Sequence, residues 1–269
     1  MWWRLRLWEN KIKRLIGYNS SMWKGDYATW EDAKQHCKGY DAAPILEKCK
    51  AAMLKVKAGE AAYERDSILH HEPQYSWELL TVILKIAHQT NFKVHILDFG
   101  GSLGSVYFQN KKFLQQFDFQ DFSWNIVEQP NFVKCGKKYA EDGILKFYNT
   151  IEDCLKEKQP HIILASGVVS HVENPYFWID TFKQTNASYI ILDRIPIIEG
   201  TRDIITVQNV FTAIYEGSYP CRFFNENNLT NSFTPYTIEA ITVPYDDVVW
   251  LNGRQNVWKG YILNNNNIT

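Results

Sequence analysis

The sequence predicts an α/β fold: a Rossmann-like, doubly wound and mostly parallel sheet of seven strands, with a C-terminal antiparallel hairpin and an N-terminal helical cap. Three observations lead to this prediction. From residue 93 onward, short apolar runs alternate with segments of helical periodicity. The first apolar run breaks into a glycine-rich turn, which a helical segment follows. Two β-rich runs end the chain, and a fold of this kind binds ligands at the carboxyl ends of its parallel strands.

Each expected element has its own local signal. Apolar runs predict parallel strands at about 94–99, 123–128, 145–148, 161–166 and 188–193. Helical spacing predicts helices at about 105–116, 130–140 and 175–185. The expected terminal hairpin pairs residues 237–245 with residues 256–263.

The chain divides into three expected regions. Residues 1–21 form a basic amphipathic segment, residues 22–92 form the helical cap, and residues 93–269 form the ligand-binding domain. Within that domain residues 194–236 show few periodic runs, and long connections of this kind are usually functional lids or binding loops. We therefore expect a lid over 194–236.

Composition excludes several classes of protein. Hydrophobic residues make up 45% of the 269 residues and charged residues 22%, which is typical of a folded, soluble chain. The net charge of −1 gives no basic footprint, so nucleic acid is not an expected partner. The five cysteines lack a C-x-x-C pair, which favours reduced thiols in the cytoplasm and gives no support for a metal site.

The N-terminal segment has two interpretations. On a helix, Leu5, Trp8 and Ile12 share one face, and the basic residues lie elsewhere. Basic helices rich in Trp can lie in a membrane interface, so residues 1–18 are a candidate for peripheral contact with the inner membrane. The favoured alternative is packing on the chain's own domain or on a partner subunit of a homo-oligomer. No apolar run is long enough to span a bilayer, and the start lacks the pattern of a signal peptide.

The most informative motif is the turn after the first predicted parallel strand. In LDFGGSLG, Asp98 precedes Gly100, Gly101 and Gly104. Such a turn brings the backbone close to a ligand where the N–H groups of a helix start are unpaired. A dinucleotide's diphosphate would meet a like charge at Asp98, whereas S-adenosylmethionine (SAM) has no phosphate and carries cationic sulfonium and amino groups. We therefore expect SAM as the cofactor.

A second carboxylate strengthens this expectation. Glu128 ends the next predicted strand and can accept hydrogen bonds from both ribose hydroxyls of SAM. The structural alternative is that the glycines merely turn the chain, that Asp98 caps the following helix and that Glu128 is a solvated strand end. The combination of two acids with this strand order favours the cofactor site.

These motifs also resemble known proteins. The DFGGSLG turn, Glu128 and the final hairpin resemble class I SAM-dependent methyltransferases. The chain is more similar still to a bacterial methyltransferase family whose members often occur in capsule and O-antigen polysaccharide gene clusters. The motifs that carry this similarity are MWKGDYATWEDA, GYD, YERDS, LDFGGSLGSVYFQN, VEQPNFVKCG, ILDR, TVQ and SYPCRFF. At one position, Ser102 stands where the class has its middle glycine, which either narrows the approach of the methionine moiety or offers a hydroxyl to the ligand carboxylate.

The resemblance implies a set of cofactor-binding residues. They are Asp98, Gly100, Gly101, Ser102, Gly104, Glu128, Gln129, Tyr148, Asn149, Ser166, Gly167 and Arg65. Adenine is expected near Tyr148 and Asn149, where an aromatic face and a polar group suit a purine. The transferred methyl group is expected beside Ser166 and Gly167. Arg65, in a segment expected near the end of a helix, would bind the cofactor carboxylate, with a solvated helix face as the alternative.

Methyl transfer to a hydroxyl needs an aligned nucleophile and a base that removes its proton. His171, just after the fourth parallel strand, is the expected base because a near-neutral pKa suits this role, and a structural histidine is the open alternative. Asp193 and Arg194, at the end of the fifth strand, are expected at the same rim. Arg202 and Arg222 flank the expected lid and would either hold a phosphate or form ordinary surface pairs.

We hypothesise a cytoplasmic SAM-dependent O-methyltransferase for capsule or surface-polysaccharide biosynthesis. Its acceptor would be a sugar, a sugar nucleotide or a small phosphorylated precursor. One alternative is a catalytically silent, methyltransferase-like module in a polysaccharide assembly complex, which Ser102 and the amphipathic start motivate. The other is a nicotinamide-dependent oxidoreductase or epimerase, which Asp98 and the missing G-x-G-x-x-G motif disfavour.

Overall fold

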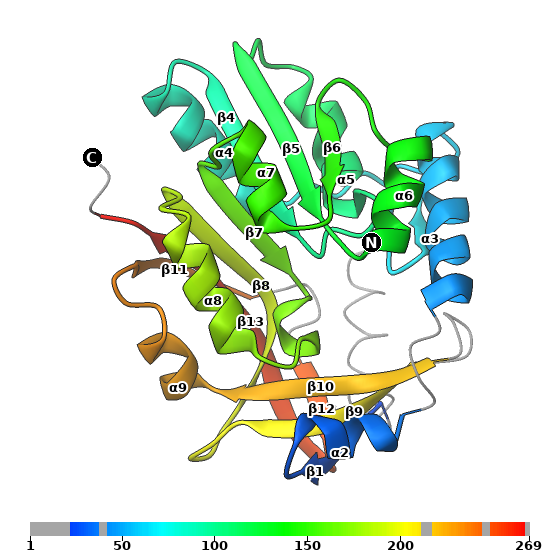
Figure 1. Cartoon of the computed structure of the whole chain (residues 1–269), viewed down its shortest axis with the longest axis vertical. Helices are drawn as coiled ribbons and strands as arrows, with labels where there is room; N and C mark the ends of the chain where they lie inside the picture. The colour runs from blue at the N-terminus through cyan, green and yellow to red at the C-terminus, as the bar shows by residue number, and fades with distance from the viewer. Residues whose placement is uncertain (1–21, 38–41, 211–216, 244–247, 267–269) are drawn as a thin grey trace, which may run out of the picture.

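The computed structural model describes residues 22–37, 42–210, 217–243 and 248–266 of the chain. Its centre is a set of five parallel strands in the order β6-β5-β4-β7-β8 (Figure 1). They are β4 (Lys93–Phe99), β5 (Asp121–Val127), β6 (Leu145–Tyr148), β7 (Ile162–Ser166) and β8 (Tyr189–Ile198). The five predicted parallel strands are confirmed.

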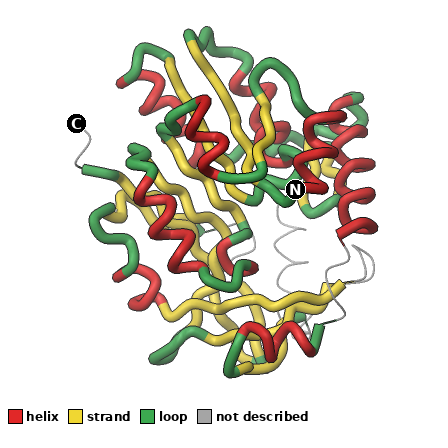
Figure 2. The backbone as a smooth tube through the Cα atoms, in the orientation of Figure 1, coloured by secondary structure: helices red, strands yellow, loops and turns green. Residues whose placement is uncertain are grey.

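Helices cover both faces of these strands (Figure 2). On one face lie α3 (Ala42–Lys57), α4 (Trp77–Gln89), α5 (Ser105–Leu114) and α6 (Pro130–Tyr139). On the other face lie α7 (Ile151–Glu157) and α8 (Pro175–Gln184). Successive strand residues point to opposite faces, so Ile96 joins the first of these two apolar cores and Leu97 the second. Burial of both faces explains why the strands show continuous apolar runs in the sequence.

Beyond β8 the sheet continues with two antiparallel pairings. β13 (Arg254–Asn264) runs antiparallel to β8, and β11 (Thr237–Thr242) runs antiparallel to β13. The predicted terminal hairpin is confirmed in the pairing of β11 with β13. The short strand β12 (Val248–Leu251) lies between them in the chain and also pairs with β13.

The predicted count of seven strands is wrong, because the described sheet has 11 and is mixed. The four additional strands are β1 (Trp23–Tyr27), β9 (Ile204–Val210), β10 (Gly217–Asn225) and β12. The pairings run from β8 through β10, β9, β1, β12 and β13 back to β8. These four strands, with the ends of β8 and β13 that pair with them, form a closed ring, here called the strand ring (Figure 1). Its small apolar core includes Trp23, Phe223 and Leu251.

Strands take the place of the lid expected over 194–236. β8 continues to Ile198, and β9, β10 and helix α9 (Glu226–Asn231) follow it. The sequence signal failed because seven of the nine residues of β10 are buried without alternation. A strand that packs on both sides has no period of two by which it could be recognised.

The N-terminal region contains strands as well as the expected helices. α2 (Trp30–Gln35), α3 and α4 lie where helical spacing predicts them, but β1 and the hairpin of β2 (Tyr63–Arg65) with β3 (Ile68–His70) were not expected. The helix end expected near Arg65 is not found there, because α3 ends at Lys57 and Gly59 follows with a left-handed φ of +77°, a conformation that typically stops a helix. YERDS therefore forms a strand and a turn rather than a helix end.

The amphipathic segment of residues 1–21 lies outside the described residues, and so does the expected membrane contact of residues 1–18. Within the described ranges, no helix is long and apolar enough to cross a membrane.

Candidate functional site

The candidate site lies at the carboxyl end of β4, where the order of the strands along the sheet changes direction. β4 has β5 on one side and β7 on the other, and a crevice opens beyond the carboxyl ends of strands at such a switch point. A cavity of about 2630 Å³ lies there. It is lined by the glycine turn after β4, the β2–β3 hairpin, the loop after β7 and part of the strand ring.

The glycine turn is tightly enclosed. Gly100 has a left-handed φ of +71°, and a Cβ atom there would lie 2.5 Å from the side chain of Val168. A Cβ atom on Gly101 would lie 2.6 Å from the carboxylate of Asp98. Gly104 is the N-cap of α5 and is also left-handed, with a φ of +96°. The chain therefore needs glycine at these positions, for backbone conformation or for close approach.

Ser102 takes a left-handed φ of +53°, a conformation that glycine adopts at lower cost. Its backbone N–H donates a hydrogen bond to the carboxylate of Glu128. Its hydroxyl lies near the thiol of Cys49 on α3, which is hydrogen-bonded to Ser67 Oγ at 3.3 Å. Ser102 thus shapes the Glu128 site through its backbone, while its side chain lies beside α3.

Three carboxylates converge on the glycine turn from separate elements. Asp98 on β4 is 1% exposed, Glu64 on β2 is 5% exposed, and Glu128 directly follows β5. All three line the cavity, and none forms an ion pair with another described residue. Burial raises the pKa of each, and that of Asp98 to about 7, although Trp124 Nε1 donates it a hydrogen bond of 2.9 Å. This negative charge suits a cationic ligand.

Sequence reasoning did not single out Glu64. The Glu64 carboxylate accepts hydrogen bonds from the Ser67 N–H at 2.9 Å and from the Ser105 hydroxyl at the start of α5. Arg65 also lines the cavity, but as the next strand residue it projects to the other face of β2, and its guanidinium carbon lies 5.8 Å from the centre of the Tyr63 ring. If YERDS had been interpreted as a strand, the alternation of side chains would have placed Glu64 and Arg65 on opposite faces.

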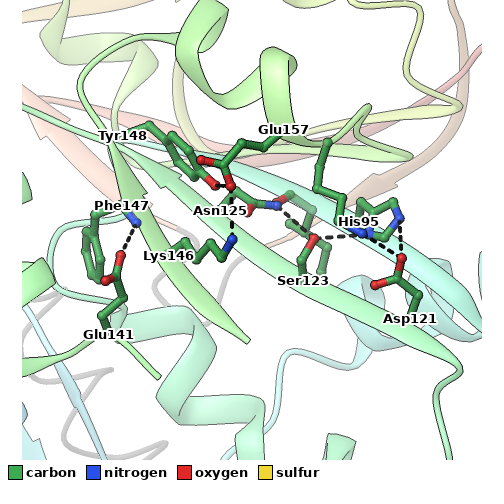
Figure 3. Close-up of polar contacts among 11 residues, drawn as sticks. His95, Asp121, Ser123, Asn125, Glu141, Lys146, Phe147, Tyr148 and Glu157 are labelled. Atoms are coloured by element: carbon green, nitrogen blue, oxygen red, sulfur yellow. Dashed lines mark hydrogen bonds and ion pairs between the residues drawn. The ribbon is translucent and has the colours of Figure 1, made fainter. Parts of the chain in front are cut away.

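The expected adenine region is only partly on the cavity wall. Asn149 lines the cavity, as do the first residues of α7, and Gln129 lines it at the start of α6. Tyr148 is not among the lining residues. Its hydroxyl donates a hydrogen bond of 2.9 Å to Glu157, a carboxylate that also pairs with Lys146 (Figure 3). The structure therefore places Tyr148 against α7 rather than beside the cofactor region.

His171 ends the short helix η1 (Val169–His171) on the cavity wall. Its Nδ1 lies 3.3 Å from the Pro220 carbonyl oxygen on β10, and its ring contacts Tyr219 edge-on at a centroid distance of 5.0 Å. The near-neutral pKa expected of His171 is wrong, because burial lowers the pKa of the imidazole to about 4, and the ring is neutral at pH 7. With its proton on Nδ1 and donated to Pro220, the ring offers Nε2 as an acceptor, which no described residue engages.

The four predicted rim residues come together on one wall of the cavity. The Ser166 hydroxyl donates to the Asp193 carboxylate at 2.9 Å, and the Gly167 N–H donates to the Asp193 carbonyl at 2.9 Å. Arg194 Nη2 lies 3.4 Å from the Ser166 carbonyl oxygen. Arg194 Nη1 also lies 3.4 Å from the Asp66 carboxylate, which ties β8 to the β2–β3 turn.

The other two arginines that were considered for a phosphate are not among the cavity-lining residues. Arg202 forms an ion pair of 2.5 Å with Asp26, and Arg222 lies 3.6 Å from the carboxylate of Asp203. The first pair joins the segment before β9 to β1, and the second joins β10 to the same segment. The exposed Arg202–Asp26 pair agrees with the surface-pair alternative, whereas the Arg222–Asp203 pair is largely buried.

No protein-family model and no curated protein matches the sequence. Among solved structures, the N-terminal domain of EvdMO1 with S-adenosylhomocysteine (SAH) bound is 12% identical, and the match covers 84% of this chain and 97% of that one with a TM-score of 0.46. The glycopeptide N-methyltransferase MtfA with SAM is 8% identical, with 68% and 85% covered and a TM-score of 0.43. A SAM-dependent methyltransferase from Clostridium acetobutylicum is 8% identical, with 68% and 89% covered and a TM-score of 0.42. These overlaps are loose, so we base the function on the geometry of the site.

Proposed function

We propose that the chain is an enzyme, a SAM-dependent methyltransferase, and that it methylates a hydroxyl oxygen of a small carbohydrate acceptor. One observation carries the proposal: the carboxylates of Glu64, Asp98 and Glu128 surround the glycine turn, and none of them forms an ion pair with a described residue, although the more distant Arg194 guanidinium acts on Glu64. Buried charges are normally paired. SAM is positively charged at its sulfonium and amino groups and supplies the missing charge.

The same carboxylates argue against a dinucleotide cofactor. A diphosphate binds at a helix start where N–H groups and the helix dipole favour negative charge. Here the Asp98 carboxylate lies directly behind the turn, within 2.6 Å of where a Gly101 Cβ atom would be. Two phosphate charges would therefore be repelled at the position where such a cofactor needs attraction.

Separate residues suit separate parts of SAM. The Glu128 carboxylate is oriented by the N–H groups of Ser102 and Gln129, the latter at 2.5 Å, and its remaining acceptor positions suit ribose hydroxyls. Asn149 and the adjoining apolar Ile151 offer a polar and an apolar surface to adenine. Bound SAM supplies a methyl group that is activated by its cationic sulfur.

His171 is the proposed general base. Its Nε2 takes the proton of the acceptor hydroxyl as that oxygen bonds to the methyl carbon, and SAH is the coproduct. The Pro220 carbonyl holds the imidazole in the tautomer that leaves Nε2 unprotonated. Asp193 and Arg194 in the middle of β8, with Ser166 and Gly167 at the end of β7, are proposed to border the reacting groups.

The acceptor and pathway follow from the motif resemblance. We propose a sugar or sugar nucleotide acceptor in capsule or surface-polysaccharide biosynthesis, at a cytoplasmic location. The N-terminal domain of EvdMO1 was crystallised in the presence of SAH and D-fucose, which makes D-fucose a convenient first probe.

The test is calorimetry with SAM, followed by a screen for SAH release. The screen contains free monosaccharides, D-fucose among them, nucleotide-linked sugars and sugar 1-phosphates. We expect SAM to bind and at least one sugar to be methylated. Absence of SAM binding would overturn the cofactor assignment. Binding without methylation of any acceptor would instead favour the silent-module alternative.

SAM binding is expected to weaken as the pH falls below about 7. The pKa of Asp98 in the ligand-free protein is about 7, so at lower pH the carboxyl group is protonated and must lose a proton before it can pair with the cation. Each pH unit below that value then costs about tenfold in affinity. Titration between pH 5.5 and 8.5 measures this slope.

Burial raises the pKa of Glu64 and Glu128 in the same direction, whereas that of His171 is lowered to about 4 and adds no change in this range. In Asp98→Asn the dependence of SAM affinity on pH should become weaker. An affinity that does not change with pH in the wild type would contradict the role of Asp98.

A further inference from the structure

The strand ring presents a row of side chains to the cavity. Trp23 on β1 lies directly opposite Gln208 on β9, and Gln208 lies directly opposite Tyr219 on β10. Residues that are directly opposed on neighbouring strands project from the same face of a sheet. All three line the cavity, and Tyr219 contacts the His171 ring at 5.0 Å. The row therefore leads from the ring to the proposed base.

Three buried polar atoms in or beside this row have no hydrogen-bond partner within the described part of the chain. They are Gln208 Oε1, Trp23 Nε1 and Ser170 Oγ. Trp23 is 5% exposed and Ser170 is 1% exposed, and both lie beside the thiol of Cys221, which is a weak hydrogen-bonding group. Buried polar atoms are normally satisfied, because an unsatisfied one destabilises the fold. All three residues line the cavity, so a polar ligand there can satisfy these atoms.

The chemistry of the row is neutral and aromatic. It contains two aromatic side chains and one amide but no charged group, and Trp258 packs edge-on against Trp23 at 5.8 Å. Lys34 also lines this part of the cavity, but its ammonium group lies 3.6 Å from Glu31. A phosphate needs cationic or clustered N–H donors, which the row itself lacks. Arg194, which lines the same cavity and interacts electrostatically with Tyr219, is paired with Asp66 at 3.4 Å. Aromatic faces with a neighbouring amide suit a sugar ring, which has apolar faces and an edge of hydroxyls.

We propose that Trp23, Gln208 and Tyr219 form the acceptor subsite and that it takes a neutral, hydroxylated sugar ring. Gln208 is the specificity-determining residue: its amide donates to one ring hydroxyl and accepts from another. The ring then lies between the strand ring and His171, with a further hydroxyl directed at the base. This inference rests on the proposed function and deepens it by naming the acceptor class.

The test measures sugar binding to the SAH-loaded protein by saturation-transfer NMR. The probes are neutral monosaccharides, D-fucose included, and the matching sugar 1-phosphates. We expect binding of at least one neutral sugar, about a tenfold or greater loss of its affinity in Gln208→Leu, and partial retention in Gln208→Asn. Affinity for SAH, measured by calorimetry, should change by less than about twofold, because Gln208 is not part of the carboxylate site.

Gln255→Leu is the matched control, since Gln255 is an exposed glutamine on β13 that is not among the cavity-lining residues. It should bind the sugar like the wild type. A denaturant midpoint for each variant shows whether the fold is intact.

Unchanged sugar affinity in folded Gln208→Leu would overturn the proposal. So would binding of sugar phosphates alone, or the absence of neutral-sugar binding to wild-type protein that binds SAH. Failure to bind SAH is a separate outcome that overturns the proposed function. In that case sugar affinity is compared between the ligand-free wild type and ligand-free Gln208→Leu. A loss of neutral-sugar affinity in the variant supports the subsite, and unchanged affinity overturns it.

Discussion

Replacing His171 by alanine is expected to lower the turnover of methyl transfer about 100- to 10,000-fold, with less than about a twofold change in SAM affinity. The imidazole contacts β10 through Pro220 and Tyr219. The carboxylates that attract SAM lie on β2 and at the ends of β4 and β5. The substitution therefore removes proton transfer and leaves the cofactor charges in place. SAH release with the best acceptor from the screen measures turnover, and calorimetry measures SAM affinity.

Two comparisons separate proton transfer from a structural role of His171. His88, exposed on α4 and not among the cavity-lining residues, gives the matched control His88→Ala, which should keep full turnover. Added imidazole should restore part of the turnover of His171→Ala, because it can accept the proton in the space that the side chain leaves. A packing defect would not respond to imidazole. Full activity of His171→Ala would assign the base to another residue.

Replacing Asp98 by asparagine is expected to weaken SAM binding about 100-fold, or roughly 3 kcal/mol, as is typical when one member of a buried charge pair is lost. Asparagine has nearly the same shape, and its amide oxygen can still accept the hydrogen bond from Trp124 Nε1. The variant thus removes charge with little change in packing. Calorimetry at pH 8, where the wild-type carboxyl group is ionised, measures the difference.

Asp121→Asn is the control for charge removal on the same sheet. Asp121 starts β5 at the opposite end of the strands, where it lies 3.5 Å from His95 (Figure 3). It also pairs with Lys158 at 2.6 Å. This variant should bind SAM like the wild type. If Asp98→Asn also bound SAM like the wild type, Asp98 would have no part in cofactor binding and the charge argument for SAM would fail.

The parallel half of the fold could be predicted from the sequence because its signals are local. The run that forms β4 is buried on both faces, and the turn after it needs glycine for positive φ and close approach. Asp98, at the end of that run, is fixed by the strand itself. Strand, turn and first carboxylate are therefore all encoded within about ten residues.

The strand ring and Glu64 could not be predicted because they depend on distant contacts. β1 contains only five residues, and it is a strand because Trp23 pairs with Gln208 on one side and with Leu251 on the other. Glu64 reaches the cavity because Asp66 and Ser67, both with positive φ, turn the chain into a tight hairpin. Asp and Ser occur in helix caps and in turns of many kinds, and the Gly that usually marks a two-residue hairpin with positive φ is missing, so the pair does not indicate that turn.

Two strands, the parallel strand β8 and its antiparallel neighbour β13, belong both to the main sheet and to the strand ring. β8 pairs with β7 near its start and with β10 at its end, and β13 pairs with β12 near its start and with β11 at its end. A strand advances about 3.3 Å per residue. The number of residues in these two strands therefore sets the distance between the proposed cofactor site and the proposed acceptor subsite. Adding one residue to either strand would move one site by about a hydrogen-bond length and turn its side chains to the other face. For the proposed methyl transfer, strand length would set the distance between cofactor and acceptor, and we expect variation in acceptor size in the side chains of the ring rather than in its spacing.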